Sequence, residues 1–120
     1  MPDDLKKTMD FGGNVIAVLG GSGLLGSAVA EGLADFNASP LIIDIDDKAG
    51  KKLREKIIEN GSKAQFHLAD FSQTKKIPQL VSEIEELYGN ISGWVLCFIH
   101  EQRIGAINLM KFLLRVGMIM

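Results

Sequence analysis

A glycine-rich stretch from residue 20 to residue 26, Gly-Gly-Ser-Gly-Leu-Leu-Gly, constrains the fold of this chain more than any other feature. It follows directly after a continuous apolar run, residues 14–19, and it opens a segment with helical spacing. A short apolar run bounded by glycines is typical of a strand that is buried on both faces of a parallel sheet. The sequence therefore predicts a strand, a tight turn and a helix in direct succession.

Glycines recur at every third position of this stretch, and each suits a different feature of a dinucleotide-binding turn. One allows the sharp turn out of the strand, one lets the backbone approach a pyrophosphate, and one lets the helix pack close to the sheet. The helix amino terminus offers free N–H groups and a positive dipole end to phosphates. An ordinary turn is the alternative for such a loop alone, and the absence of Gly-Lys-Ser/Thr excludes a Walker-type loop. The predicted dinucleotide contacts are Gly20, Gly21, Ser22, Gly23, Leu24, Leu25 and Gly26.

Alternating strand and helix patterns continue to residue 98. Strands are predicted at 41–43, 64–68 and 94–98, and helices after Gly26, at 48–60 and at 77–88. Residues 37–40 are expected to end the first helix, and glycines 61 and 89 to follow the other two. The expected buried helix positions are Ala28, Val29, Gly32, Leu33, Leu53, Ile57, Ile58, Ile77, Leu80, Val81, Ile84, Leu87 and Tyr88. This order predicts an α/β fold, a Rossmann-type doubly wound parallel sheet that is truncated after about four strands.

Asp44 closes the second predicted strand. A carboxylate at this spacing from the glycine loop accepts hydrogen bonds from the adenosine ribose hydroxyls of NAD, and it repels the 2′-phosphate of NADP. No lysine or arginine lies in the loop or directly after Asp44, so we expect NAD rather than NADP, with Ile45 beside it. A solvated loop acid or a helix cap is the alternative, which we favour for Asp46 and Asp47.

Residues 13–97 resemble the amino-terminal part of the short-chain dehydrogenase/reductase family. The glycine loop resembles the family's Thr-Gly-x-x-Gly-x-x-Gly form, with Leu19 where threonine is usual. A second match, Leu-Ala-Asp-Phe at 68–71, implies that Asp70 hydrogen-bonds the adenine amino group and that Phe71 supports the ring. A turn or helix cap before Ser72 is the alternative for Asp70.

The resemblance breaks after the fourth predicted strand. The family usually carries Asn-Asn-Ala-Gly there, whereas this chain has Leu-Cys-Phe-Ile at 96–99. The family's catalytic set is a serine and Tyr-x-x-x-Lys, and the only tyrosine here, Tyr88, has Ser92 four residues later. Intact relatives would transfer a hydride between NAD and a hydroxyl or carbonyl carbon, but no catalytic residue is predicted in this chain. A non-catalytic NAD sensor and a fragment of a nucleotide-sugar epimerase are the alternative functions.

Composition limits the partners and the compartment. The net charge of −2 argues against nucleic-acid binding, and no apolar run reaches membrane-spanning length. Cys97 is the single cysteine and the start of the chain is polar, which favours a cytoplasmic protein. No metal site is predicted, because Cys97 and His100 are only two potential ligands. Intact relatives are expected to form homo-oligomers.

Residues 99–120 do not continue the pattern. We divide the chain into an extension at 1–13, a dinucleotide-binding half at 14–98 and this atypical, strongly apolar tail. The tail is either a terminal helix or the product of a shifted reading frame near Phe98. We favour the shift, because one permitted back-translation, read in another frame, gives a polar stretch that resembles the family. The strand at 94–98 would then form an exposed apolar edge that promotes association.

Overall fold

The computed structural model describes residues 10–97 and 103–115 of the chain as a four-stranded parallel sheet covered by helices. This confirms the predicted Rossmann-type architecture. The strands are β1 (Val15–Leu19), β2 (Ser39–Asp44), β3 (Gln65–Leu68) and β4 (Ile91–Leu96). The helices are α2 (Leu24–Asp35), α3 (Asp47–Glu59), α4 (Ile77–Tyr88) and α5 (Arg103–Arg115), with a 3₁₀ turn, η1 (Thr74–Lys76), before α4.

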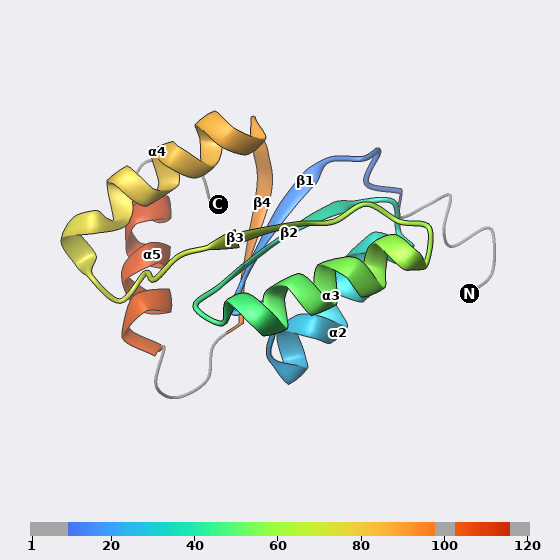
Figure 1. The fold of residues 1–120 in the computed structure, drawn as a ribbon. Coiled ribbons are helices and arrows are strands. Elements are labelled where there is room, and N and C mark those ends of the chain that lie inside the picture. The colour runs from blue at the N-terminus through green and yellow to red at the C-terminus, as the bar shows by residue number, and fades with distance from the viewer. Residues whose placement is uncertain (1–9, 98–102, 116–120) are drawn as a thin grey trace.

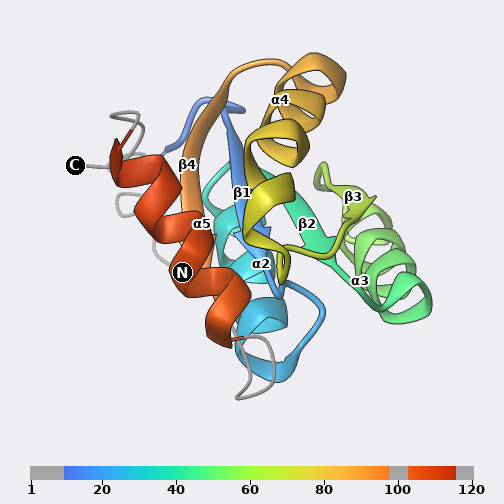
Figure 2. The ribbon, with the colours of Figure 1, turned by 90° about the vertical axis from the view of Figure 1, so that its left-hand side faces the viewer.

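The strand order β3-β2-β1-β4 contains one reversal of direction. The chain proceeds from β1 to β2 and β3, and then crosses back to add β4 on the other side of β1. Because such crossovers are right-handed, the reversal moves the following helices to the opposite face. Accordingly α2 and α3 cover one face of the sheet, and α4 and α5 cover the other (Figures 1 and 2). Sheets of this kind leave a crevice at the reversal, beyond the carboxyl ends of β1 and β4.

The second strand begins earlier than the sequence predicted. Ser39 and Pro40 were expected to end the preceding helix, but they are the first two residues of β2 and are buried. The helix already ends at Asp35, and Asn37, with a φ of 64°, turns the chain. Pro40 is tolerated near the start of the strand, where the missing N–H disturbs the sheet least.

Small residues bring α2 close to the sheet. Its buried positions are Gly26, Ala30 and Ala34, so the expected face, which included the exposed Ala28, was wrong. These residues are spaced four apart, and they turn the side without large side chains toward the sheet. On α3 the buried positions are Gly50, Leu53 and Ile57, whereas Ile58 is half exposed, contrary to expectation.

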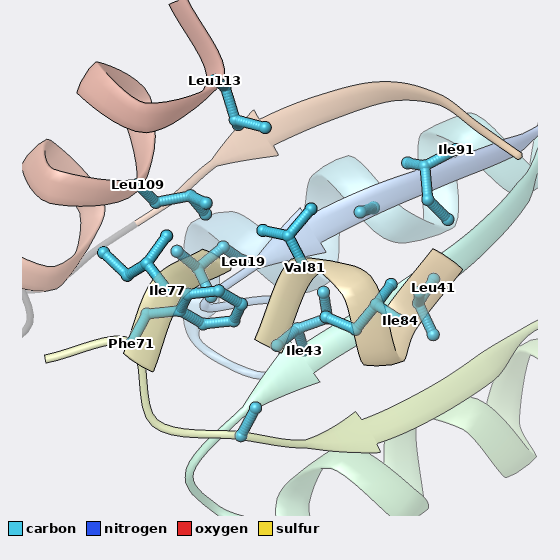
Figure 3. Packing of buried hydrophobic residues seen from close by; sticks show 12 residues of the cluster. Leu19, Leu41, Ile43, Phe71, Ile77, Val81, Ile84, Ile91, Leu109 and Leu113 are labelled. Carbon is cyan, nitrogen blue, oxygen red and sulfur yellow. The ribbon is translucent and has the colours of Figure 1, made fainter. Parts of the chain in front are cut away.

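Larger side chains fill the opposite face, between the sheet, α4 and α5 (Figure 3). Leu109 and Leu113 of α5 are fully buried there, which agrees with the terminal-helix alternative for the tail. The reading-frame hypothesis concerns the gene and stays a prediction. The largest buried members of this cluster from the other elements are Leu19, Leu41, Ile43, Phe71, Ile77, Val81, Ile84 and Ile91.

Leu87 of α4 and the start of β4 differ from the expectation. Leu87 of α4 was predicted to be buried but is mostly exposed. The fourth strand starts at Ile91 rather than at residue 94, and Phe98 lies outside the described residues. β4 is an edge strand whose Trp94 is only partly buried.

Within the described ranges, no helix has the length and apolarity needed to cross a bilayer.

Candidate functional site

A groove of about 290 Å³ lies at the carboxyl ends of β1 and β2, next to the amino terminus of α2. It occupies the crevice that the strand order creates, with β4 ending on its other side. The predicted contacts that line it are Gly20, Ser22, Gly23, Leu24, Leu25, Gly26, Asp44 and Ile45. The topology therefore brings the glycine loop and the residues after β2 to one groove. Gly21, which was also predicted as a contact, is buried and does not line the groove. The contacts of these residues with a dinucleotide stay a prediction.

Two positions of the loop, 20 and 26, require glycine for steric reasons. Gly20 has a φ of 76°, a left-handed conformation that side chains rarely adopt, and its N–H donates to the carbonyl of Ile43 at 2.8 Å. A Cβ on Gly26 would lie 2.2 Å from the carbonyl oxygen of Gly20 and 2.6 Å from the Cα of Gly21. Both are backbone atoms, so no side-chain rotation could make room. Gly26 therefore lets α2 start directly against the loop.

Gly23 has a different reason to be glycine. A Cβ there would come no closer than 3.6 Å to the carbonyl oxygen of Gly20, which is ordinary contact. Gly23 is the N-cap of α2, no side chain of the described residues caps that helix, and its first turn holds no acidic residue. Within the described part of the chain, no side-chain anion therefore caps the amino-terminal N–H groups and the positive dipole end. The open side of this turn lies on the groove, as a phosphate site requires.

Asp44 is buried at the end of β2 with its side chain fully hydrogen-bonded, and 7% of the residue is exposed. Its Oδ2 accepts the N–H of Ser22 at 3.2 Å and the hydroxyl of Ser22 at 2.5 Å. Its Oδ1 accepts the N–H groups of Ile45 at 2.7 Å and of Asp46 at 3.2 Å. Asp44 thus ties the glycine loop to the end of β2 and places a negative charge in the wall of the groove.

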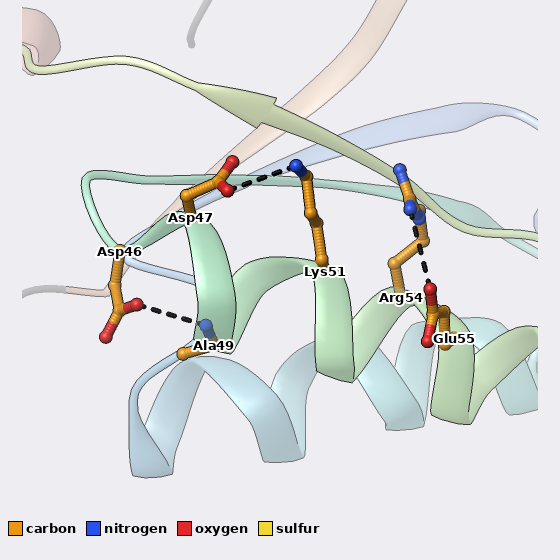
Figure 4. Close-up of polar contacts among 6 residues, drawn as sticks. All are labelled: Asp46, Asp47, Ala49, Lys51, Arg54 and Glu55. Carbon is orange, nitrogen blue, oxygen red and sulfur yellow. Dashed lines mark hydrogen bonds and ion pairs between the residues drawn. The ribbon is translucent and has the colours of Figure 1, made fainter.

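Asp46 and Asp47 serve the start of α3, as the sequence analysis favoured (Figure 4). Asp46 is the N-cap, and its Oδ1 accepts the N–H of Ala49 at 3.0 Å. Asp47 makes an ion pair with Lys51 at 3.1 Å on the exposed side of the helix. Of the three aspartates at positions 44, 46 and 47, Asp44 is the one that is buried.

Asp70 and Phe71 lie outside the groove. The Oδ1 of Asp70 accepts the N–H of Ser72 at 2.9 Å, which is the turn-capping contact that we considered as the alternative. Hydrogen bonds from Ser72 hold the pKa of Asp70 below its usual value. The side chain of Phe71 packs in the core beside α4, so only its backbone is left for a ligand. An adenine contact at Asp70 stays a prediction.

Three lining residues were not predicted: Asp46, Ala49 and Cys97. Asp46 and Cys97 lie just beyond the carboxyl ends of β2 and β4, the position that brings residues of a doubly wound sheet to its crevice, and Ala49 lies in the first turn of α3. The N–H of Cys97 donates to the carbonyl of Leu19 at 2.8 Å and extends the pairing of β4 with β1. Burial raises the pKa of the Cys97 thiol, which disfavours the thiolate form. His100, the other residue considered with it, lies outside the described ranges.

Comparison with known proteins agrees with this geometry. A family model described as short chain dehydrogenase matches residues 14–97. The chain is 30% identical over 82 residues to the CLA biosynthesis dehydrogenase/reductase of Lactiplantibacillus plantarum, an alignment that takes in 68% of this chain and 29% of that protein. The chain spans less than a third of the length of the curated relatives it matches.

Solved structures share the fold. The citronellol catabolism dehydrogenase of Pseudomonas aeruginosa PAO1 matches with a TM-score of 0.76 and 19% identity over 90% of this chain and 52% of that one. An NAD⁺-bound xylitol dehydrogenase matches with a TM-score of 0.69 and 21% identity over 88% of this chain and 48% of that one. Other matched structures hold NADP or NADPH. At these identities the likeness is one of fold.

Proposed function

Because this chain belongs to the short-chain dehydrogenase family of oxidoreductases, we propose that its groove binds the dinucleotide cofactor of that family, and that it takes NAD in preference to NADP. The pyrophosphate would lie against the uncapped start of α2, and the adenosine ribose beside Asp44. Ile45, half exposed at the rim, would flank the adenosine. Asp70, just past β3, would contact the adenine amino group.

One observation carries the proposal: the groove joins an uncapped helix amino terminus to a buried carboxylate. The first attracts a phosphate and the second accepts hydroxyl hydrogen bonds. A dinucleotide presents both groups, a pyrophosphate followed by a ribose diol. An ordinary turn between a strand and a helix needs neither the open Gly23 nor a buried acid opposite it.

The preference for NAD rests on charge. Asp44 would lie next to the phosphate that NADP carries on its adenosine ribose, and like charges at short range repel. The described residues that line the groove include no lysine or arginine to offset this repulsion. NAD places a hydroxyl at the same position, and this hydroxyl can donate a hydrogen bond to the carboxylate.

Within the family, the bound nicotinamide supplies hydride transfer to or from a hydroxyl or carbonyl carbon. The 120 residues of this chain contain no Tyr-x-x-x-Lys, since residue 92, four after Tyr88, is serine. We therefore propose that these residues bind and orient the cofactor without turnover of their own. We also propose that the protein acts in the cytoplasm and that intact relatives assemble into homo-oligomers.

The test is to titrate NAD and NADP against the wild-type chain and against Asp44→Ala. Loss of one charge-assisted hydrogen bond corresponds to about 1.5–3 kcal/mol, or roughly a tenfold to hundredfold weaker NAD binding. NADP binding should weaken far less, because its repulsion is removed at the same time. The ratio of the two dissociation constants is not changed by partial unfolding of the variant.

Asp47→Ala is the matched control, since it removes an exposed carboxylate of the same segment outside the groove lining. It should leave both dissociation constants unchanged. Equal NAD affinity in Asp44→Ala and wild type would remove Asp44 from the site. Absence of binding of either cofactor to the folded wild-type chain would refute the proposed function itself.

A further inference from the structure

The carboxylate of Asp44 has no free acceptor position in this structure. A carboxylate offers about four lone-pair sites, and the four hydrogen bonds described above occupy them. With only 7% of the residue exposed, little of it can meet a ligand as the chain stands. A ribose hydroxyl can therefore reach Asp44 only if one of the present donors leaves.

The four donors are not equivalent. Three are backbone N–H groups, from Ser22, Ile45 and Asp46, and the course of the chain fixes their positions. The fourth is the hydroxyl of Ser22, which moves away by rotation about one side-chain bond. Ser22 is partly exposed and lines the groove, so there is space for that rotation.

We propose that the Ser22 hydroxyl is a displaceable latch on Asp44, and that a ribose hydroxyl takes its place when the cofactor binds. This inference rests on the proposed function and adds a specificity-determining residue to it. The exchange replaces one O–H donor with another on the same Oδ2, while the three N–H groups keep the carboxylate in position. No charge is moved and no bond other than hydrogen bonds changes.

The latch makes binding depend on a ribose hydroxyl. A ligand with the base and the pyrophosphate but without ribose hydroxyls leaves the Ser22–Asp44 contact intact and gains nothing from Asp44. A ligand with the hydroxyls gains that contact only after displacing Ser22, so its apparent affinity is reduced by the fraction of chains in which the latch is closed. Removal of the Ser22 hydroxyl should leave binding of the first kind of ligand unchanged and should clearly strengthen binding of the second kind.

The experiment compares wild type with Ser22→Ala, using ADP and 2′,3′-dideoxy-ADP as probes and NAD as the complete cofactor. A charge-assisted hydrogen bond to a carboxylate is strong enough that its loss should tighten ADP and NAD binding about tenfold. Dideoxy-ADP should bind both proteins with the same affinity. Ser82→Ala, an exposed serine on α4 away from the groove, is the matched control and should change none of the three dissociation constants.

Thermal melting without ligand gives a second measurement. Ser22→Ala should lower the melting temperature, because the latch joins the glycine loop to β2. Tighter ADP and NAD binding together with a lower melting temperature would establish the latch. Unchanged or weaker ADP binding in Ser22→Ala, or an equal gain for dideoxy-ADP, would overturn it while leaving the proposed function standing. If NAD binds neither the wild type nor the variant, the proposed function fails and the latch with it.

Discussion

The two faces of the sheet are packed in different ways. Against α2 and α3, half of the six residues of the buried cluster are alanines, Ala30, Ala34 and Ala64, and the other three are Ile42, Leu53 and Ile57. Against α4 and α5, leucine, isoleucine, valine and phenylalanine side chains fill a larger cluster. The groove is lined by the starts of α2 and α3, whereas no residue of α4 or α5 among the described ones lines it.

This contrast agrees with the proposed use of the groove. The start of α2 must come close to the glycine loop, because the proposed phosphate site is made of backbone rather than of side chains. Close approach requires small residues at the contact, and it leaves little apolar area to bury. The large side chains on the other face supply that area, at about 25 cal/mol for each Å² removed from water. One face determines the geometry and the other contributes more of the stability.

The largest expected effect tests the α4/α5 face through the tail. Leu109→Ala removes a fully buried side chain and should lower the free energy of unfolding by about 2–5 kcal/mol, measured by urea denaturation. Met110→Ala, the partly exposed neighbour on the same helix, is the control and should cost far less. Similar midpoints for both variants would show that α5 does not contribute to this core, and would favour the tail as a reading-frame product without a structural role.

A smaller effect should separate stability from binding on the α2/α3 face. Gly26→Ala places a Cβ against the backbone of Gly20 and should cost about 1–3 kcal/mol, because overpacking displaces the loop. Gly23→Ala meets no such contact, so its thermal melt should stay close to wild type. Both variants should lose NAD affinity in a titration, Gly23→Ala because its methyl group fills the phosphate approach. A Gly23 variant with unchanged NAD binding would contradict the assignment of this turn to the pyrophosphate.

The smallest expected effect concerns a polar contact on the α4/α5 face, between His67 and Tyr88. His67 on β3 contacts the hydroxyl of Tyr88 on α4 at 3.1 Å, and burial lowers the pKa of His67 below its ordinary 6.5. The unfolded chain therefore takes up a proton near pH 6.5 while the folded chain still resists it. Stability should be complete above this pH and decline as the pH falls toward the lower folded pKa.

Denaturation midpoints measured between pH 8 and pH 5 check this, with His67→Gln as the variant that should flatten the curve. Asp70, whose folded pKa is depressed, also loses its contribution as the pH falls, but only below the ordinary aspartate value of 3.8. The two windows are thus separate. An unaltered pH profile in His67→Gln would assign the decline to other groups.

Much of the fold and of the groove could be predicted from local patterns. Four residues of the run at 14–19, residues 16–19, are buried in the sheet, as continuous apolar character indicates, whereas Asn14 is exposed and Val15 is partly buried. Gly20 and Asp44 lie at the two strand ends that the alternation of strands and helices brings to one edge. Helix faces were less predictable: Ala28 and Ile58 were expected to be buried and are exposed. The helices instead turn other positions toward the sheet, Gly26, Ala30 and Ala34 on α2 and Gly50, Leu53 and Ile57 on α3.

The sequence by itself determined the order of the elements, the parallel sheet and the position of the glycine loop, because these depend on periodicity and on backbone freedom within short segments. Only the tertiary structure decided how Asp44 is used. Its four hydrogen bonds come from a loop 22 residues away and from the turn after β2, and no local pattern contains both. The tertiary structure also decided the place of α5, since the burial of Leu109 depends on contacts with strands and helices distant in sequence. Local propensity specifies elements, whereas the saturation of a buried charge depends on which elements meet.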